Sequence, residues 1–372
     1  MLRRDNIMRM KKILALILAT VMAGSIVTGC FGQKTSVTEP ESTTTISGGD
    51  ESIGGGTTSG NTEENTTPDY TQSDRVVEKG MLSNPNADKK TQKIYEYIWD
   101  NFGTNIITCQ QESTWKGTPD YEMNYIEETT GKLPAMRGLD FMNNDFNGVV
   151  SRAKAWAEKG GLVTICWHTG ISSSGYQESL DDRADFSKLF TPGTDEYNTL
   201  MASWDKAAKA LLRLQDAGVT VFWRPFHEFD GRWFWWGKAG ANKFVQLWQL
   251  MYNKFTYEYG LNNLIWVLGY TGNVRDGWYP GDEYCDIIGS DSYDNNTNVS
   301  GYNKLLKVSE NKPLCFHECG NVPLVEDFEN DKAMWSWFMI WHTDHLMAND
   351  KDTLSAVYNS DKAITLDKLP EF

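Results

Sequence analysis

Residues 219–237 read VTVFWRPFHEFDGRWFWWG, and this stretch decides both the fold and the candidate site. It opens with the apolar letters VTVF, a run short enough to be a buried strand. At the end of that run the sequence turns polar, and Arg224, His227 and Glu228 fall within five residues. Catalytic groups gather at the C-terminal ends of the strands in barrel enzymes. The stretch therefore predicts a barrel strand that delivers a carboxylate and a cation to a site.

A row of aromatic residues follows this carboxylate, namely Trp233, Phe234, Trp235 and Trp236. Aromatic rings stack on the apolar faces of sugars, and a carboxyl group can transfer protons. The row is also expected to raise the pKa of the carboxyl group by excluding water. The combination is typical of a site that cleaves glycosidic bonds. The alternative is a buried, paired glutamate, and core packing suits Trp235 and Trp236 as well as sugar binding does.

Apolar runs alternate with segments of helical periodicity along the rest of the chain. For example, Leu200, Trp204, Ala208 and Leu211 recur at helical spacing. This order predicts an α/β fold, a (β/α)8 TIM barrel with parallel strands. The predicted strands are 105–109, 133–141, 162–167, 219–222, 264–268, 286–289, 313–316 and 337–341, the main helices are 87–101, 145–158, 197–217 and 242–259, and 271–280 is a loop.

Two glutamates follow predicted strands. Hydrolysis of a glycosidic bond needs two carboxyl groups that flank it, one as proton donor and one as nucleophile or base. Glu228 follows the fourth strand, and Glu318 follows the seventh in the segment PLCFHECG. Glu310 is a less suitable partner because it precedes that strand in a helix-to-loop segment. The alternative for Glu318 is a structural glutamate at the barrel rim.

The segments RPFHE and WFWWG together resemble the acid/base segment of glycoside hydrolase family 26, whose members are mostly β-mannanases. The resemblance extends over roughly residues 90–345. It implies a retaining double-displacement mechanism, with Glu228 as acid/base and Glu318 as nucleophile. The sequence departs from the family pattern in HEFDG, where members more often carry Met and Asn after the glutamate. The resemblance implies no role for His317.

The resemblance also implies a set of side chains around the substrate. Arg224 would hold the surroundings of the nucleophile, His227 would orient its neighbours, and Tyr293 in SDSYD would hydrogen-bond the nucleophile. His168 would contact the sugar at the cleaved bond, two tryptophans would stack on sugars, and Asp140 is a weaker candidate for a polar contact. Simple packing is the alternative for the histidines and the tyrosine. The predicted substrate-binding residues are His168, Arg224, His227, Trp233, Tyr293 and Trp341.

The N-terminal residues predict export and anchoring. Basic residues precede an apolar segment that ends in VTGC, which resembles a bacterial lipobox with Cys30 as the lipidated residue. An ordinary cleaved signal with an incidental cysteine is the alternative. We expect a lipoprotein signal peptide at 1–29, a disordered Ser/Thr/Gly-rich linker at 30–73 and a catalytic domain at 74–372. The protein would then lie on the extracellular face of the bacterial membrane, lipid-anchored, or be secreted.

The composition and the motifs argue against several classes of binding partner and cofactor. The formal net charge of −15 argues against nucleic acid and suits an enzyme that acts on a neutral polymer. The five histidines form no HExxH motif and the cysteines form no CxxC pattern, so we expect no metal. The sequence also has no glycine motif for phosphates or dinucleotides, so we expect no cofactor.

The predicted function is a retaining endo-β-1,4-mannanase that hydrolyses mannan or glucomannan, with a β-mannan or related plant cell-wall polysaccharide as its partner. A β-1,3-1,4-glucanase or a β-xylanase on the same scaffold is an alternative, because the family contains these activities. A non-catalytic glycan-binding lipoprotein is an alternative of another class. Binding alone, however, needs neither Glu228 nor Glu318.

Overall fold

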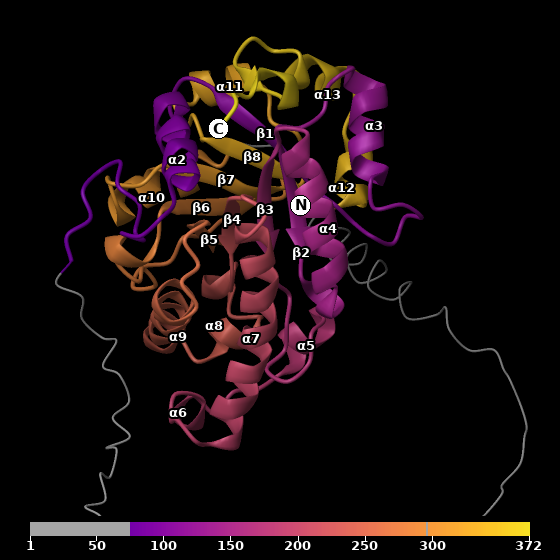
Figure 1. Ribbon diagram of the computed structural model, residues 1–372. Coiled ribbons are helices and arrows are strands. Elements are labelled where there is room, and N and C mark those ends of the chain that lie inside the picture. The colour runs from indigo at the N-terminus through magenta and orange to yellow at the C-terminus, as the bar shows by residue number, and fades with distance from the viewer. Residues whose placement is uncertain (1–74, 295–296) are drawn as a thin grey trace, which may run out of the picture. The chain divides into compact units, whose positions relative to one another are not determined.

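The computed structural model describes residues 75–294 and 297–372 (Figure 1). Parallel strands follow one another around a ring, which closes because the first strand pairs with both the second and the eighth. They are β1 (Ile106–Gln111), β2 (Met136–Asp140), β3 (Leu162–Cys166), β4 (Val221–Arg224), β5 (Leu264–Tyr270), β6 (Ile287–Ser292), β7 (Leu314–Cys319) and β8 (Trp337–Ile340). A short strand, β9 (Ala363–Ile364), adds to the first residues of β1. The predicted (β/α)8 barrel is confirmed.

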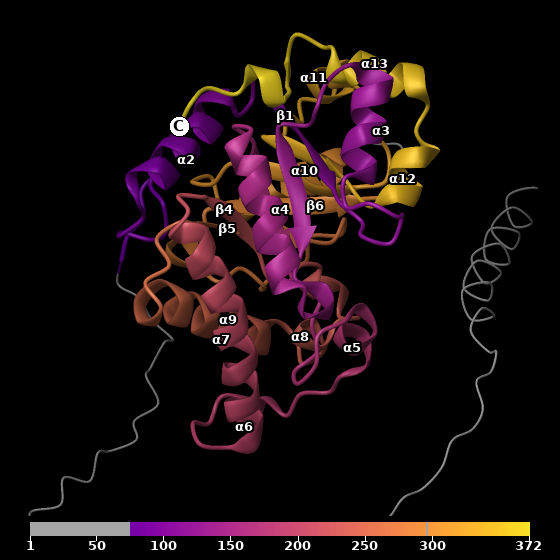
Figure 2. The same ribbon diagram turned by 45° about the vertical axis from the view of Figure 1, so that its right-hand side comes forward.

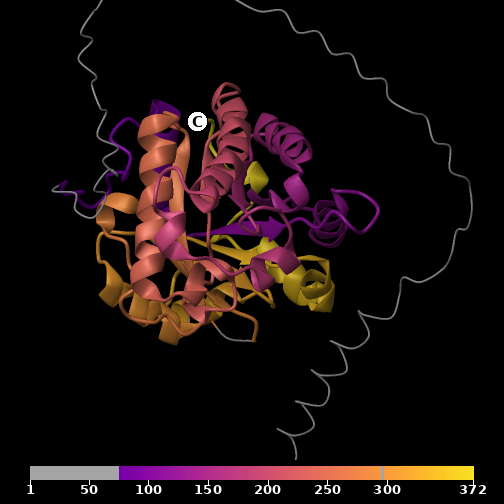
Figure 3. The same ribbon diagram turned by 90° about the horizontal axis from the view of Figure 1, so that it is seen from below.

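The α-helices of the described residues are α2 (Lys89–Asn101), α3 (Tyr121–Thr130), α4 (Phe146–Glu158), α5 (Tyr176–Asp181), α6 (Phe186–Leu189), α7 (Asp195–Gln215), α8 (Trp235–Lys238), α9 (Ala241–Asn253), α10 (Val299–Val308), α11 (Val325–Asn330), α12 (Thr343–Ala348) and α13 (Lys351–Tyr358). They surround the strands in the view from below (Figure 3). α4 packs on β2 and β3, and α10 packs on β6 and β7. The short helices α5 and α8 lie side by side, and α6 lies against α7 (Figures 1 and 2).

Several strands run further than the sequence predicts, into polar residues near the candidate site. β1 extends through Gln111, β6 through Ser292 and β7 through Cys319. Glu318 therefore lies inside β7 and not after it, and β4 likewise includes Arg224. Backbone hydrogen bonds to neighbouring strands hold these polar positions in the sheet, and hydrophobic periodicity does not report such bonds.

The helix predicted over 242–259 changes its form before its end. α9 stops at Asn253, and a π-helical turn continues over Lys254–Glu258. The loop predicted over 271–280 is confirmed. In this described part of the chain, a 3₁₀ turn at Asp282–Tyr284 is the only helical element between β5 and β6.

The interior of the barrel is a packed apolar cluster. Alternate residues of a strand point inward, so Cys109 of β1 packs with Phe222 of β4 and with Trp337 and Met339 of β8. The Phe222 and Trp337 rings meet edge to face, with centroids 5.5 Å apart. Two residues further along β4, Arg224 takes the next inward position and brings a buried positive charge to the barrel mouth.

Helix α2 packs against the N-terminal end of this cluster. Its Ile94 is buried there, and the hydroxyl of Tyr95 donates to the carbonyl of Asp286 at 2.9 Å. The C-terminal residue Phe372 lies beside α2 (Figures 1 and 2), where its ring makes an edge contact with Tyr97. The opposite, C-terminal end of the strands is therefore the end that remains available for a site.

The predictions for residues 1–29 and 30–73 and for lipidation of Cys30 lie outside the described residues. Within residues 75–294 and 297–372, no helix combines the length and the apolar character that a membrane span requires.

Candidate active site

Glu228 lies in the tight turn that follows β4, and its backbone is left-handed with φ 54°. Phe226, two residues earlier, also has a positive φ of 53°. Such conformations cost free energy for residues other than glycine and collect at functional sites. The N–H of Glu228 donates to the carbonyl of Gly269 on β5 at 2.8 Å. The turn is thus held by a neighbouring strand, and it aims the Glu228 carboxyl group into the barrel mouth.

Glu318 is buried on β7, and a side chain from β4 and another from the residue that follows β6 hold its carboxylate. Arg224 Nη1 donates to Oε1 at 3.1 Å, and the hydroxyl of Tyr293 donates to Oε2 at 2.7 Å. Hydrogen bonds from a guanidinium to a carboxylate are stronger than those between neutral groups. Both side chains lie where the resemblance implies contacts with the nucleophile. Glu310, the alternative partner, is exposed and precedes the N-terminal end of β7, so it is remote from this site.

The sheet is irregular where Glu318 lies. The pairing of β7 with β8 changes register between Phe316 and Cys319. In a regular strand consecutive side chains point to opposite faces, but His317 and Glu318 both contact Arg224. A β-bulge re-aims side chains in this way, and bulges are frequent next to active sites. The irregularity thus brings two consecutive polar residues to the same side of the sheet.

Asp291 on β6 is a residue of this site that the sequence analysis missed. Its buried side chain shares a hydrogen bond with the carboxyl group of Glu228. Two carboxyl groups can hydrogen-bond to each other only when one of them is protonated. The polar segment SDSYD after the sixth strand was the available signal, but only Tyr293 was selected from it.

The pKa of Glu228 is raised well above its usual range. Burial is the largest cause, and the negative charges of Asp291 and Glu318 add to it. Burial and the charge of Glu318 also raise the pKa of Asp291, so the Glu228–Asp291 pair titrates as a unit that holds a proton. Burial was expected to raise the pKa of Glu228. The sequence analysis did not predict that Asp291 and Glu318 would raise this pKa as well. The hydrogen bond from Trp233 lowers the pKa of Glu228, against these effects.

His317, for which the resemblance implies no role, links the charged groups of the site. Its Nε2 lies 2.9 Å from Arg224 Nη1, and its Nδ1 lies 2.7 Å from Asp291 Oδ1. A guanidinium can only donate, so Nε2 accepts, and Nδ1 carries the proton that is donated to Asp291. Burial and the charge of Arg224 lower the pKa of His317 to about 3, which keeps the ring neutral. Gly269 leaves room for this ring, because an added Cβ would lie 2.4 Å from Nε2.

His227 is also buried and neutral. Burial, followed by the nearby positive charges of His168 and Arg224, lowers the pKa of His227 well below its usual range. Its Nε2 lies 3.9 Å from Glu318 Oε1, while its Nδ1 has no hydrogen-bond partner in the described structure. Leaving a buried ring nitrogen without a partner costs free energy. His227 therefore does not fit the alternative of a core histidine with satisfied hydrogen bonds.

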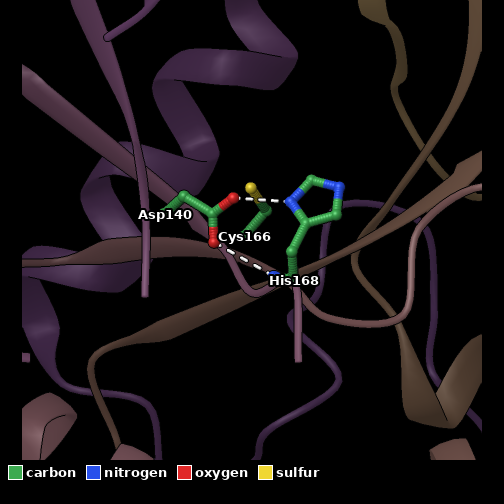
Figure 4. A group of neighbouring side chains, drawn as sticks. All are labelled: Asp140, Cys166 and His168. Carbon is green, nitrogen blue, oxygen red and sulfur yellow. Dashed lines mark hydrogen bonds and ion pairs between the residues drawn. The ribbon is translucent and has the colours of Figure 1, made fainter. Parts of the chain in front are cut away.

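His168 follows β3 and is oriented by Asp140 of β2 (Figure 4). Asp140 Oδ2 lies 2.5 Å from His168 Nδ1, and Oδ1 accepts from the backbone N–H of His168 at 3.0 Å. Burial is the largest single influence and would lower the pKa of His168, but the charge and the hydrogen bond of Asp140, together with the charges of Glu318 and Glu228, raise it overall. The second ring nitrogen points away from Asp140 (Figure 4). Asp140 thus fixes the orientation of the His168 ring.

Two of the predicted tryptophans lie beside the reacting groups. Trp233 is 42% exposed, and its Nε1 donates to Glu228 Oε2 at 3.0 Å. Trp341 follows β8, and its ring centroid lies 6.0 Å from that of His168. Both rings are therefore placed where a sugar at the site could stack on them.

The other two tryptophans of the aromatic row belong to the core. Trp235 and Trp236 are buried, and their N–H groups donate to the carbonyls of Thr169 and His227. The structure thus favours the packing interpretation for this pair. Their hydrogen bonds hold the turn that carries Glu228 against the loop that follows β3.

A cavity of about 310 Å³ opens on the Glu228 side of the site. It lies over the ends of β4, β5 and β6, and its walls are mostly polar. A concave, polar and partly aromatic space of this kind suits a sugar. Residues that line it include Glu228, Trp233, Gly272, Asn273, Asp291 and Tyr293.

Two groups of side chains in the described part of the chain bring potential metal ligands together. They are Asp140, Cys166 and His168 (Figure 4), and Asp291, His317 and Glu318. Metal ligands must be deprotonated. Burial raises the pKa of Cys166 well above its usual range, so the thiol keeps its proton, and His317 Nδ1 carries a proton as well. Both groups are better explained as hydrogen-bond networks, and the absence of a metal stays a prediction.

Residues 83–368 match the family model for glycosyl hydrolase family 26. A mannan endo-1,4-beta-mannosidase of Thermothelomyces thermophilus is 33% identical over 315 residues, which cover 77% of this chain and 63% of that protein. Mannan endo-1,4-beta-mannosidase B of Piromyces sp is 29% identical over 312 residues, which cover 78% of this chain and 54% of that protein. This chain thus spans between one half and two thirds of the length of these relatives.

Solved structures agree with these matches. A ruminal GH26 endo-beta-1,4-mannanase superposes with a TM-score of 0.74 at 31% identity, covering 82% of this chain and 73% of that one. A beta-mannanase from a symbiotic protist of the termite Reticulitermes speratus, complexed with gluco-manno-oligosaccharide, superposes with a TM-score of 0.71 at 31% identity. The match covers 79% of this chain and 98% of that one. Because the family model spans most of the sequence and the barrel agrees, the chain belongs to glycosyl hydrolase family 26.

Proposed function

We propose that this protein is a retaining endo-β-1,4-mannanase that hydrolyses mannan or glucomannan, with Glu228 as acid/base and Glu318 as nucleophile. The observation that carries the proposal is the contrast between the two carboxyl groups. Arg224 and Tyr293 both donate to Glu318, whereas the pKa of Glu228 is raised well above its usual range. A carboxyl group whose pKa is raised suits the acid, and one that accepts hydrogen bonds from a cation and a hydroxyl suits the nucleophile. Relatives named as mannanases support the choice of sugar.

In the first step, Glu318 attacks C1 of the sugar while Glu228 gives its proton to the glycosidic oxygen. The C1–O bond breaks, the aglycone leaves as an alcohol, and an ester joins the glycone to Glu318. Arg224 and Tyr293 hold the attacking carboxylate before the reaction, so little reorientation is needed. Asp291 keeps the proton on Glu228 through its charge and its hydrogen bond.

In the second step, Glu228 is a carboxylate and takes a proton from water. The resulting hydroxide equivalent attacks C1, the ester bond breaks, and Glu318 is released as a carboxylate. Two displacements at C1 restore the original configuration. A group with a raised pKa is a good base once it is deprotonated, so one environment serves both steps.

The release of reducing ends from four polysaccharides tests the proposed activity. We expect the highest kcat/KM on mannan and glucomannan, with products that initially retain the configuration of the cleaved bond by NMR. Preference for mixed-linkage glucan or xylan would assign a different sugar to the same scaffold. Retained binding without any released ends would instead favour a glycan-binding lipoprotein.

The pH dependence should report the pair of carboxyl groups. Activity is lost as pH rises through the pKa of the acid, because the acid must be protonated to donate. Asp291→Asn removes one of the charges that raise the pKa of Glu228, so the alkaline limb of kcat/KM should move to lower pH. Asp216→Asn, an exposed change of equal charge at the end of α7, is the control and should leave the profile in place. An unchanged alkaline limb in Asp291→Asn would contradict the coupling.

We also propose that Cys30 carries a lipid anchor and that residues 30–73 are a linker that lets the enzyme reach polysaccharide outside the cell. The lipobox-like VTGC and the Ser/Thr/Gly-rich composition support this proposal. A diacylglyceryl anchor together with an acyl chain would hold the protein at a bilayer.

Lipidation can be tested directly on the cysteine. In cells fed an alkyne fatty acid, the wild-type protein should be labelled and should sediment with membranes. Cys30→Ser should lose the label and appear in the medium or as unprocessed precursor. A labelled, membrane-bound Cys30→Ser protein would rule out the lipobox.

A further inference from the structure

Asp230 is a buried carboxylate close to the acid/base, and the mechanism described above gives it no role. It lies two residues after Glu228, in the 3₁₀ turn Phe229–Gly231. It also belongs to the segment HEFDG, in which the sequence departs from the family pattern. A buried charged group costs free energy unless it is hydrogen-bonded, so the partners of Asp230 indicate what it does.

In the described structure, the hydrogen-bond partners of Asp230 lie in the loop that follows β5. Its Oδ1 accepts from the backbone N–H of Thr271 at 2.8 Å. Its Oδ2 accepts from the Thr271 hydroxyl at 3.0 Å and from the backbone N–H of Arg275 at 3.1 Å. Hydrogen bonds to an ionised acceptor are stronger than those between neutral groups. Asp230 therefore holds both ends of the loop segment 271–275.

The part of the loop between these two ends forms a wall of the cavity. Gly272 and Asn273 line the cavity and are exposed, whereas Thr271 and Val274 are buried. Val274 has a left-handed backbone with φ 41°, which a β-branched residue adopts only at a cost in free energy. Such a conformation persists only where the surrounding structure fixes it, and the bonds to the carboxylate on both sides of Val274 contribute to this.

The same loop rests on β6. Ser290 Oγ donates to the carbonyl of Thr271 at 2.9 Å. A Cβ added to Gly272 would lie 2.8 Å from the carbonyl oxygen of Asp291, so a side chain at position 272 would push the loop away from the strand. The turn that carries the acid/base, the loop 271–275 and β6 thus form one connected unit around the cavity.

The position of the cavity relative to the acid decides which part of the substrate it can take. Glu228 gives its proton to the glycosidic oxygen, so the aglycone leaves from the side of Glu228. The cavity lies on that side and also contacts Trp233. A sugar of the aglycone would therefore lie against Gly272 and Asn273, where backbone groups and an amide can hydrogen-bond to its hydroxyls.

We propose that Asp230 is a positioning residue that fixes the loop 271–275 as a wall of the aglycone side of the cleft, and that it thereby sets how well an acceptor sugar binds there. This inference rests on the proposed function, because it assumes that Glu228 is the acid/base. In Asp230, different oxygens accept from the two loop N–H groups. An asparagine has one oxygen, so one of these N–H groups would lose its acceptor in either orientation of the amide.

The partition of the glycosyl-enzyme between water and an added sugar measures binding on the aglycone side. A dinitrophenyl β-mannobioside forms the glycosyl-enzyme, and mannobiose then competes with water for it. The 4-hydroxyl of mannobiose attacks C1, its proton passes to Glu228, and the ester bond to Glu318 breaks to release mannotetraose. Both routes use Glu228 as base. A displaced Glu228 would slow both routes and leave their ratio unchanged, whereas a displaced wall would reduce transfer relative to hydrolysis.

In Asp230→Asn we expect the ratio of transfer to hydrolysis, at a fixed subsaturating concentration of mannobiose, to fall about tenfold. Ser290→Ala frees the same loop from β6 and should lower the ratio about threefold. Asp286→Asn is the matched control. Asp286 is a buried carboxylate that accepts from the backbone N–H groups of Ser83 and Trp266, but it precedes β6 at the opposite end of the barrel. Its replacement should lower the melting temperature and leave the ratio unchanged.

An unchanged ratio in Asp230→Asn would overturn the inference, because a merely structural role would lower the melting temperature alone. If Asp230→Asn does not fold, an unchanged ratio in Ser290→Ala would overturn it in the same way. An equal fall in Asp286→Asn, or a wild-type enzyme that gives no transfer product at any mannobiose concentration, would also contradict it. If the wild-type enzyme formed no glycosyl-enzyme, the proposed function would fail instead, so the two failures are distinguishable.

Discussion

Replacing Glu318 with glutamine is expected to reduce kcat on mannan by roughly 10⁴- to 10⁵-fold, as loss of a nucleophile does in other enzymes. An amide cannot form the ester that the first displacement requires. Glutamine keeps the size of glutamate. Its amide oxygen can accept from Arg224 and its NH2 group can donate to the hydroxyl oxygen of Tyr293, in place of the two bonds of 3.1 and 2.7 Å that the carboxylate accepts. The variant should therefore fold and bind oligosaccharide, and steady-state kinetics with a calorimetric Kd separate the two properties.

Two controls make this result specific. Glu310→Gln changes the exposed glutamate before β7 and should keep full activity. In the wild-type enzyme, a 2-deoxy-2-fluoro glycoside with a good leaving group should trap an ester on the peptide that contains Glu318. More than about 1% residual activity in Glu318→Gln, or an ester on another residue, would mean that the nucleophile is misassigned.

Replacing Glu228 with alanine is expected to produce a different defect, which depends on the leaving group. Hydrolysis of mannan should fall roughly 10³-fold, within the range that general acid catalysis contributes. A dinitrophenyl glycoside needs no proton on its leaving group, so its first step should remain fast. The second step still lacks its base, and the glycosyl-enzyme should accumulate as a burst of dinitrophenolate followed by slow turnover.

Azide distinguishes the two glutamates by the stereochemistry of its product. In Glu228→Ala, azide needs no base and should attack the glycosyl-enzyme to give a glycosyl azide of retained configuration. In Glu318→Ala, azide would occupy the space of the nucleophile and give the inverted azide. An absence of leaving-group dependence in Glu228→Ala, or inverted sugar from the wild-type enzyme, would show that the roles are wrongly assigned.

Asp291 and His317 explain how the site keeps two nearby carboxyl groups in different states. Arg224 donates to both Glu318 and His317, so one cation serves the carboxylate and fixes the histidine tautomer. His317 in turn donates to Asp291, which shares a hydrogen bond with Glu228. The positive charge thus lies next to the nucleophile, and the additional negative charge lies next to the acid. This arrangement favours the protonated form of Glu228 at neutral pH.

The sequence by itself was sufficient to predict the barrel and to select the two glutamates near the C-terminal ends of the fourth and seventh strands. Alternating apolar runs and helical periodicity depend on local spacing, so each segment alone identifies most strands and the loop over 271–280. Glu228 and Glu318 could be selected for a similar reason. Polar residues that follow apolar strands in one parallel sheet must come to the same end of the barrel.

Only the tertiary structure decided which other residues join the site. Asp291 and His317 meet through a register change between β6, β7 and β8. Trp235 and Trp236 belong to the same aromatic row as Trp233 but turn into the core, where carbonyls accept their N–H groups. Barrel closure, bulges and burial are properties of several strands together. A pKa that depends on the charges of separate strands has no local signal in the chain.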